Sequence, residues 1–228
     1  MSSSEPAVEL LGVHHGYDEA GRRHVILHGI DLTVAPGEAV ALVGRSGAGK
    51  STLLNVIAGL ARPERGTVRI GGRDLTAMKE RERTLLRRRH IGFVYQFFNL
   101  IDTLSVIDNV LLPLELDGGA DGDAHERVQG LLAEVGLAGR ADAFPDRLSG
   151  GEQQRVAVVR ALAHGPGLVL ADEPTGNLDT ETGGAVLDLL GRLVRAGGHS
   201  LVIVTHSESI ASVADRTLRL ADGLLGAG

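Results

Sequence analysis

The 228-residue sequence contains no cysteine and no tryptophan, and aromatic residues make up only 3% of it. Without cysteine, the chain has no disulfide framework and no cysteine-based metal site. It also lacks any apolar run close to the roughly 20 residues that a membrane-spanning helix needs. The formal net charge of −6 argues against general nucleic-acid binding, which relies on a basic surface. These absences exclude a disulfide-rich secreted protein and a protein that spans the membrane by itself.

The first six residues, Met1 to Pro6, have neither the basic nor the apolar segment that opens a signal peptide. We interpret them as a disordered leader and expect a cytoplasmic protein. A hydrophobic content of 43% and a charged content of 23% are ordinary for a soluble globular chain. The length allows one domain with a full core, alone or with a small subdomain.

Lysine is scarce as well, and its placement is informative. The 23 basic residues comprise only two lysines, Lys50 and Lys79, and otherwise arginine. Lys50 lies in the stretch Gly44–Ser51, which matches the P-loop pattern G-x-x-x-x-G-K-[ST]. A compact ammonium fits a tight phosphate loop, whereas the wide guanidinium of arginine does not. The rare lysine at this position favours a phosphate-binding loop over a chance glycine turn.

The surroundings of this loop support the same interpretation. The apolar run Val40–Val43 precedes it, and Thr52–Leu60 follows with apolar residues spaced for one helix face. Backbone N–H groups of the loop and of the helix start bind anions. We expect Lys50 to reach the β- and γ-phosphates of a nucleotide and the Ser51 hydroxyl to face Mg²⁺. The expected nucleotide-binding residues of this stretch are Gly44, Arg45, Ser46, Gly47, Ala48, Gly49, Lys50, Ser51 and Thr52.

Hydrophobic patterning predicts two kinds of sheet and a helical arm. Continuous apolar runs at 168–171 and 201–204, with a helix between them, predict a βαβ unit of a parallel sheet. Shorter strands bounded by turn residues predict an antiparallel β layer beside the P-loop. The other predicted strands lie at 8–13, 25–34, 67–72 and 91–95, with a short edge element at 214–222. The predicted helices lie at 106–116, 124–135, 150–163 and 181–195.

Two charged segments allow alternative interpretations. The basic run 79–90 is most simply a solvated helix face. Nucleic-acid binding would need interleaved aromatic residues and conflicts with the net charge of −6. The acidic turn Asp117–Asp123 suggests a calcium loop, but the EF-hand pattern requires Glu at the twelfth position, where Val128 stands. We therefore expect no nucleic-acid partner and no metal site in this turn.

Asp172 and Glu173 directly follow the apolar run 168–171. At the carboxyl end of a strand in a parallel sheet, such acids face the ligand crevice. Because the same chain has a P-loop, we expect Asp172 to hold Mg²⁺, directly or through water, and Glu173 to polarise the attacking water. The alternative, a pair of surface acids at a strand end, suits the two residues only when they are considered alone.

The stretch Leu148–Arg155, with the sequence LSGGEQQR, is a second strong signal. Ser149 and Glu152 form the pattern of a capping box that opens a helix. The adjacent Gly150 and Gly151 weaken a first helical turn, so capping alone does not explain them. Bare N–H groups at a helix start bind anions, and the P-loop already accounts for one phosphate chain. A second nucleotide, carried by another copy of the chain arranged head to tail, would explain the stretch.

With these motifs in order, nearly the whole sequence resembles the ATP-binding cassette (ABC) ATPases. Gly44–Ser51 is similar to the family's Walker A motif, and Leu168–Glu173 to Walker B with its catalytic Glu. Leu148–Gln153 is similar to the LSGGQ signature, with Glu152 where many members have Gln. In the family, the signature of one subunit closes over ATP held by the P-loop of the other.

The resemblance implies four further site residues. Gln96 matches the Q-loop glutamine, Asp179 the D-loop aspartate and His206 the switch histidine. Tyr17, which we place in a turn at 17–21, resembles the aromatic residue that stacks on adenine; packing on the β layer is the alternative. The implied catalytic residues are Glu173, His206, Lys50 and Gln96. The implied metal-binding residues are Ser51, Gln96 and Asp172. Beyond the P-loop, the implied nucleotide contacts are Tyr17, Gln96, Ser149, Gly150, Gly151, Glu152, Asp179 and His206.

The implied architecture is a single α/β domain that binds ATP and Mg²⁺. It combines a P-loop NTPase (RecA-like) core and an antiparallel β layer, at 1–96 and 165–228, with a helical subdomain at 97–164. The signature lies in that subdomain. The expected state is a dimer of two identical chains that forms on ATP.

The sequences Phe97–Leu100 and Asp172–Asp179 are similar to a branch with macrolide exporters, lipoprotein-release systems and cell-division ATPases. This implies an ATPase subunit that powers a separate integral membrane permease from the cytoplasmic face of the cell membrane. Phe93, Phe97 and Phe98 are either hinge core or part of a groove for a short helix of that partner. A cell-division regulator is the alternative function. A small-molecule P-loop kinase would have no use for the signature stretch.

Overall fold

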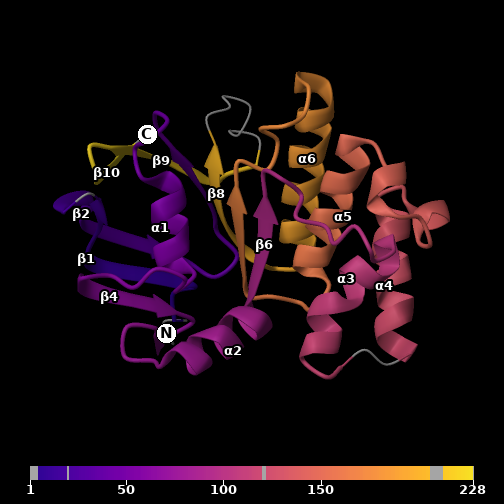
Figure 1. Ribbon diagram of the computed structural model, residues 1–228, viewed down its shortest axis with the longest axis horizontal. Coiled ribbons are helices and arrows are strands. Elements are labelled where there is room, and N and C mark those ends of the chain that lie inside the picture. Colours follow the sequence, from indigo (N-terminus) through magenta and orange to yellow (C-terminus); the bar gives the residue numbers. More distant parts are fainter. Residues whose placement is uncertain (1–4, 20, 120–121, 206–212, 228) are drawn as a thin grey trace.

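The computed structural model of the chain describes residues 5–19, 21–119, 122–205 and 213–227. It contains a four-stranded antiparallel sheet, a six-stranded sheet that is mainly parallel, and helices on both sides of the latter (Figure 1). The antiparallel sheet lies at one end of the molecule and a group of helices at the other, with the larger sheet between them. This arrangement confirms the predicted α/β fold with an antiparallel β layer.

The strands of the antiparallel sheet are β1 (Val8–Glu19), β2 (Arg22–Val34), β4 (Arg65–Ile70) and β5 (Arg73–Asp74). They lie in the order β2-β1-β4-β5. β1 and β2 form a long hairpin whose register runs from Val8 opposite Val34 to Glu19 opposite Arg22. The prediction of a turn beginning at Tyr17 was therefore wrong. Cross-strand pairing with β2 keeps Tyr17 extended, opposite His24.

The strands of the larger sheet are β3 (Ala39–Val43), β6 (Ile91–Tyr95), β7 (Leu168–Asp172), β8 (Ser200–Thr205), β9 (Arg216–Ala221) and β10 (Leu224–Ala227). Their order is β10-β9-β3-β8-β7-β6, and every pairing except β10 with β9 is parallel. The predicted parallel βαβ unit is confirmed by β7 and β8. Because parallel strands point the same way, the residues after β3, β6, β7 and β8 share one edge of this sheet.

The C-terminal element differs from the prediction. The stretch predicted as one edge element over 214–222 is β9, which lies inside the sheet next to β3, and the true edge strand is β10. Asp222 and Gly223 connect the two with positive φ angles of 49° and 72°. Asp-Gly is a common two-residue hairpin turn, because both positions tolerate the left-handed conformation. The prediction was wrong because this turn signal was overlooked.

The helices are α1 (Lys50–Ile57), α2 (Glu80–His90), α3 (Val106–Leu116), α4 (Gly122–Glu134), α5 (Gly150–Leu162) and α6 (Thr180–Ala196), with short 3-10 turns at Ala138–Arg140 and Pro145–Arg147. α1 lies between the two sheets, whereas α3, α4, α5 and α6 cover the opposite face of the larger sheet (Figure 1). The helices predicted at 106–116, 124–135, 150–163 and 181–195 are confirmed to within two residues at each end, whereas the helix expected over 52–60 is α1, which ends earlier, at Ile57. No described helix has the length and apolarity to cross a membrane.

The core consists of two apolar clusters, one on each face of the larger sheet. Along β3, Val40 and Leu42 pack into the cluster shared with α1 and the antiparallel sheet. Ala39 and Ala41 pack into the cluster shared with α3, α4, α5 and α6. Alternate side chains of one strand thus enter different clusters, which explains the continuous apolar runs in the sequence. The helices of the predicted subdomain 97–164, which are α3, α4 and α5, therefore pack in the same apolar cluster as side chains of the larger sheet.

The basic run at 79–90 is the helix α2, in which Leu86 is the buried residue. Its arginines are engaged within the chain: Arg87 donates to the Gly59 carbonyl at 3.0 Å and Arg88 to the Leu116 carbonyl at 2.8 Å. Arg89 pairs with Asp117 at 2.8 Å. These bonds connect α2 to the ends of α1 and α3. Among the described residues, no group of three or more histidine and acidic side chains is placed to hold a metal ion.

Candidate functional site

The predicted P-loop connects the end of β3 to the start of α1. Gly49, the N-cap of α1, has φ 94°, and a Cβ there would lie 2.6 Å from Ile26 Cγ2. A Cβ on Gly44 would lie 2.3 Å from the Leu220 carbonyl oxygen. Only glycine allows the loop both its left-handed turn and its close approach to the neighbouring strands. The loop therefore wraps tightly and presents its amides, as a phosphate-binding loop requires.

Lys50 is buried at the base of this loop, with 6% of its surface exposed. Its Nζ donates to the carbonyl oxygens of Gly44 at 2.9 Å and Arg45 at 3.1 Å. Both acceptors are neutral, so the ammonium charge has no carboxylate partner in these two bonds. A buried cation of this kind binds an anion strongly when one enters the loop. Phosphate oxygens are suitable partners.

Ser51 and Asp172 meet next to the lysine, although they are far apart in the sequence. The Ser51 hydroxyl donates to Asp172 Oδ1 at 3.1 Å. Burial raises the pKa of the Asp172 carboxyl, and the hydrogen bond from Ser51 opposes that rise. A hydroxyl and a carboxylate are the hard oxygen ligands that Mg²⁺ prefers, and this pair leaves room for phosphate oxygens and water. The donor set fits the predicted metal.

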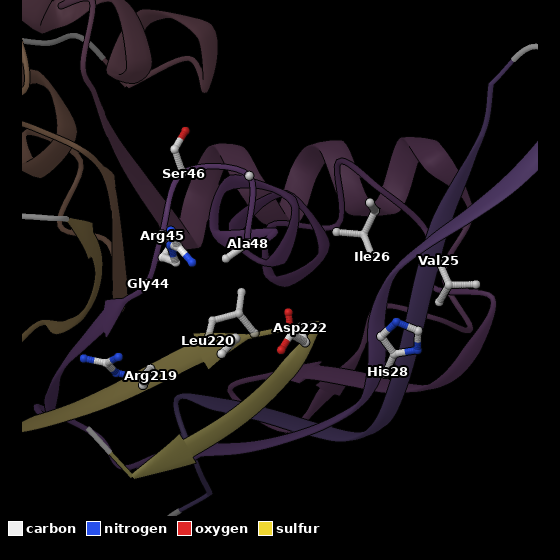
Figure 2. A pocket seen from close by; sticks show the side chains of 13 residues that line it. Val25, Ile26, His28, Gly44, Arg45, Ser46, Ala48, Arg219, Leu220 and Asp222 are labelled. Carbon is white, nitrogen blue, oxygen red and sulfur yellow. The ribbon is translucent and has the colours of Figure 1, made fainter.

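A cavity of about 660 Å³ opens beside the P-loop (Figure 2). Gly44, Arg45, Ser46, Gly47 and Ala48 form one wall. The other walls come from β2 and from the β9–β10 turn, through Val25, Ile26, His28, Arg219, Leu220, Ala221, Asp222 and Gly223. The sequence analysis did not identify these walls. The Asp222-Gly223 turn signal could have indicated the wall formed by the β9–β10 turn.

Tyr17 is not among the residues that line this cavity. It lies in β1, is 46% exposed, and packs edge to face on His15 with ring centroids 4.9 Å apart. Packing on the β layer, the alternative considered for this residue, matches its position. Stacking on adenine stays a prediction.

Glu173 follows β7 in an uncommon backbone conformation, with φ 45°. Its N–H donates to the Val204 carbonyl at 2.9 Å, which ties the end of β7 to β8. Glu173 also lines a second cavity, of about 220 Å³, together with Thr175, Asp179 and Thr205. A positive φ at a non-glycine residue costs conformational energy and is concentrated at functional positions. His206, predicted to act at the same edge, lies outside the described residues.

Gln96, the residue after β6, is held by Asn177. Gln96 Nε2 donates to Asn177 Oδ1 at 3.2 Å, and Asn177 Nδ2 returns a bond to the Gln96 carbonyl at 3.0 Å. A Cβ on Gly176 would lie 2.7 Å from Gln96 Nε2, so the glutamine lies directly on this glycine. Gln96 Nε2 thus faces Asn177, and the metal-binding role predicted for Gln96 would fall to its Oε1. Sequence reasoning did not identify Asn177 as a partner.

The signature stretch forms the start of α5. Ser149 is the N-cap and Glu152 accepts from the Ser149 N–H at 2.8 Å, so the predicted capping box is present. This bond lowers the pKa of the Glu152 carboxyl. A Cβ on Gly151 would lie 2.5 Å from Thr182 Cγ2, and one on Gly150 would lie 3.3 Å from Leu178. The two glycines thus permit close contact with α6 and the segment before it, a role that the sequence did not reveal.

Asp179 caps α6, since its carboxylate accepts from the Thr182 N–H at 2.9 Å. That bond lowers the pKa of the Asp179 carboxyl. The structure thus brings Lys50, Ser51 and Asp172 together, and Asp179 beside the signature helix. Among the described residues, the signature stretch contacts its own surroundings and not the P-loop.

Comparison with known proteins agrees with this geometry. A family model described as ABC transporter matches residues 27–176. An ABC transporter ATP-binding protein of Mycobacterium tuberculosis is 52% identical over 97% of this chain and 89% of its own length. The lipoprotein-releasing system ATP-binding protein LolD of Ruegeria pomeroyi is 50% identical over 98% of this chain and 99% of its own length. The macrolide export ATP-binding/permease protein MacB 1 of Aeromonas hydrophila is 47% identical over 96% of this chain, which spans 34% of that protein.

Solved structures give the same result. The dimeric post-hydrolysis state of the ATP-binding cassette MJ0796, bound to ADP and Pi, superposes with a TM-score of 0.87 at 37% identity. The match covers 96% of this chain and 98% of that one. A further dimeric structure of MJ0796, a bacterial ABC transporter cassette, also has a TM-score of 0.87, at 39% identity. A chain with this fold, and about half of its residues shared with ATP-binding subunits, belongs to the ABC transporter family as one of its ATP-hydrolysing cassettes.

Proposed function

We propose that two copies of this cassette close on two ATP molecules and thereby drive a separate membrane permease. The observation that carries the nucleotide part is the contact of Ser51 with Asp172 at 3.1 Å beside the buried Lys50. A buried cation and a pair of oxygen ligands at the end of a glycine loop suit a nucleoside triphosphate with its metal.

In this proposal, Lys50 exchanges its two carbonyl partners for phosphate oxygens, and the P-loop amides bind the phosphate chain. Ser51, Asp172 and Gln96 would hold Mg²⁺, which neutralises charge on the phosphates when bound. Glu173 orients a water molecule and accepts its proton as the oxygen attacks the terminal phosphorus. His206, which the family resemblance implies as the switch histidine, assists hydrolysis in this proposal.

The signature completes the site across the dimer. Ser149, Gly150 and Gly151 place backbone N–H groups at the start of α5, where the helix dipole favours an anion. We assign these groups, with Glu152 and Asp179, to the nucleotide of the second copy. The dimeric form of the MJ0796 cassette in both solved structures supports this arrangement.

The permease part of the proposal is supported by the names of the relatives and by one surface feature. A groove of about 520 Å³ lies between α2, β6, α3 and α5, and Phe93, Leu112, Pro113 and Leu116 contribute apolar side chains to it. Nearby in the chain, Phe97 is 70% exposed, whereas Phe98 is half-buried and lies against Gly150. An exposed phenylalanine two residues before Asn99, which lines this apolar groove, suits a short helix of a membrane partner. Phe97 is thus the better docking candidate of the two.

Lipoprotein release or macrolide-type export is the transport class that the relatives' names favour, and the chain would work at the cytoplasmic face of the cell membrane. A regulator of cell division that acts through a membrane partner is the second candidate. The same Phe97–Leu100 and Asp172–Asp179 sequences resemble both groups. The identity of the membrane partner decides between them.

The test is affinity purification of the tagged chain from detergent-solubilised membranes, with identification of bound integral membrane proteins and measurement of ATPase stimulation by them. We expect a permease to co-purify and to stimulate hydrolysis. Phe97→Glu should reduce its recovery about tenfold or more, as expected when a hot-spot aromatic is lost. Leu224→Glu, at a 55% exposed apolar residue of β10, is the matched control and should bind normally. Equal recovery with both variants would refute the docking surface.

A further inference from the structure

The loop that follows β6 has a backbone that needs external support. It runs from Gln96 to Asn99, and both Phe98 and Asn99 have positive φ angles, of 25° and 51°. Two consecutive non-glycine residues in that region of conformational space are unfavourable by themselves. Neighbouring groups must therefore stabilise the observed loop.

α5, the helix that begins with the signature, provides that support at two points. Gln154 Nε2 donates to the carbonyl of Tyr95, the residue just before Gln96, at 3.2 Å. Six residues along the same helix, Arg160 donates to the Phe98 carbonyl at 2.8 Å and also to the Asn99 carbonyl. One helix thus holds the loop at both ends.

α5 packs tightly against β6, so the position of the loop relative to α5 is closely restricted. A Cβ on Gly92 of β6 would lie 2.1 Å from the Ala161 carbonyl oxygen of α5, so the two backbones are in direct contact. Tyr95 is opposite Asp172 in the sheet register. A displacement of α5 is therefore transmitted to the carboxyl end of β6, beside Asp172.

Burial argues that Gln154 has more than a packing role. Its side chain is 0% exposed, and its Oε1 has no hydrogen-bond partner within the described residues. A buried amide oxygen without a partner destabilises the fold, and a leucine of similar size would avoid that cost. The bond that the amide makes is the one to Tyr95.

We propose that Gln154 and Arg160 are positioning residues that fix the loop 96–99, and with it Gln96, to the signature helix α5. The inference rests on the proposed function, in which Gln96 acts at the metal. Movement of α5 on engaging the second nucleotide then shifts Gln96. Arg160 and Asn99 also line the groove assigned to the permease, so the same two contacts reach the docking surface.

Hydrogen exchange of the nucleotide-free protein tests the connection without reference to catalysis. We expect Gln154→Leu and Arg160→Leu each to speed exchange of the amides in 96–99 by about tenfold, because a local contact is lost. The control is Asn109→Ala, which removes another fully buried amide of the helical region, one that bonds to the Ile101, Leu104 and Ser105 backbone. It should lower the melting temperature and leave exchange in 96–99 unchanged.

Steady-state kinetics of the full chain tests the consequence. Gln154→Leu is expected to lower kcat by about tenfold with KM for ATP nearly unchanged, since ground-state binding by the P-loop is intact. Arg160→Lys, which keeps a donor, should recover part of the activity lost in Arg160→Leu. Unchanged exchange in both leucine variants would overturn the proposal. Faster exchange with unchanged kcat would instead refute the role of Gln96 under the proposed function, while the connection itself would stand.

Discussion

Glu173 shows at the level of one residue how this chain positions a reactive group. Its φ of 45° turns the chain sharply after β7, and the bond from its N–H to the Val204 carbonyl holds that turn. The residue before it, Asp172, is the last residue of β7, and its carboxylate accepts a hydrogen bond from Ser51. In the proposed mechanism these two adjacent carboxylates have different tasks, Asp172 at the metal and Glu173 at the water.

We expect Glu173→Gln to lower the ATPase rate by roughly 10²–10⁴-fold, because the amide keeps the shape but cannot accept a proton. ATP binding should survive, since Lys50, Ser51 and Asp172 are untouched. Gel filtration with Mg²⁺ and ATP should then show an accumulated dimer. Asp172→Asn, in contrast, should weaken binding and turnover together. Hydrolysis by Glu173→Gln at the parental rate would show that this residue is not the base.

At the level of elements, the start of α5 combines a cap with the backbone N–H groups that we propose as an anion site. The Ser149 hydroxyl and the Glu152 carboxylate bond to each other's backbone, and Glu152 also lies 3.6 Å from Arg140. These bonds lower the pKa of Glu152. A carboxyl group with a lowered pKa in the folded state stabilises the fold above its unfolded value, near 4.5, and loses that contribution as the pH falls through the folded value.

The pH dependence of Glu152→Ala follows from this. Urea unfolding without nucleotide at pH 7 should show a loss of about 1 kcal/mol, typical of a removed capping interaction. The difference from the parent should shrink as the pH falls below about 4, because protonation weakens the cap in the parent as well. Glu126→Ala, at an exposed position of α4, serves as the control and should change stability by less than about 0.5 kcal/mol. A loss that does not depend on pH would exclude the carboxylate as its source.

Periodicity and motif spacing were sufficient to predict most elements. The helix predicted over 106–116 is α3 with the same ends, and the apolar runs became strands buried on both faces. The P-loop was recognisable because its residues are contiguous in the sequence. The sequence did not reveal the Gln96–Asn177 pair or the walls of the cavity beside the P-loop. Both depend on how segments far apart in the sequence, such as β2, β6 and the β9–β10 turn, are arranged in space. The Gln154 contact likewise appears only after α5 is packed on β6.

At the level of the whole molecule, the nucleotide site is divided between two copies in our proposal. Ser149→Arg should block ATP-induced dimerisation, because a long cationic side chain would occupy the place of the second phosphate chain. Nucleotide binding to the monomer should be largely unchanged. Light scattering of the Glu173→Gln protein, with and without Ser149→Arg, measures the effect. Glu126→Arg in the same background is the control, and a normal dimer with Ser149→Arg would contradict the shared interface.

The central place of β3 has a consequence for how the protein is made. β3 is synthesised well before both strands that flank it, β8 and β9. Until those two strands have been made, β3 has two open edges and its apolar side chains lack some of their neighbours, a situation that favours aggregation or chaperone binding. The P-loop also completes its contacts late, because Gly44 lies against Leu220 of β9. We therefore expect ATP to stabilise the chain by binding only after β8 and β9 have joined the sheet.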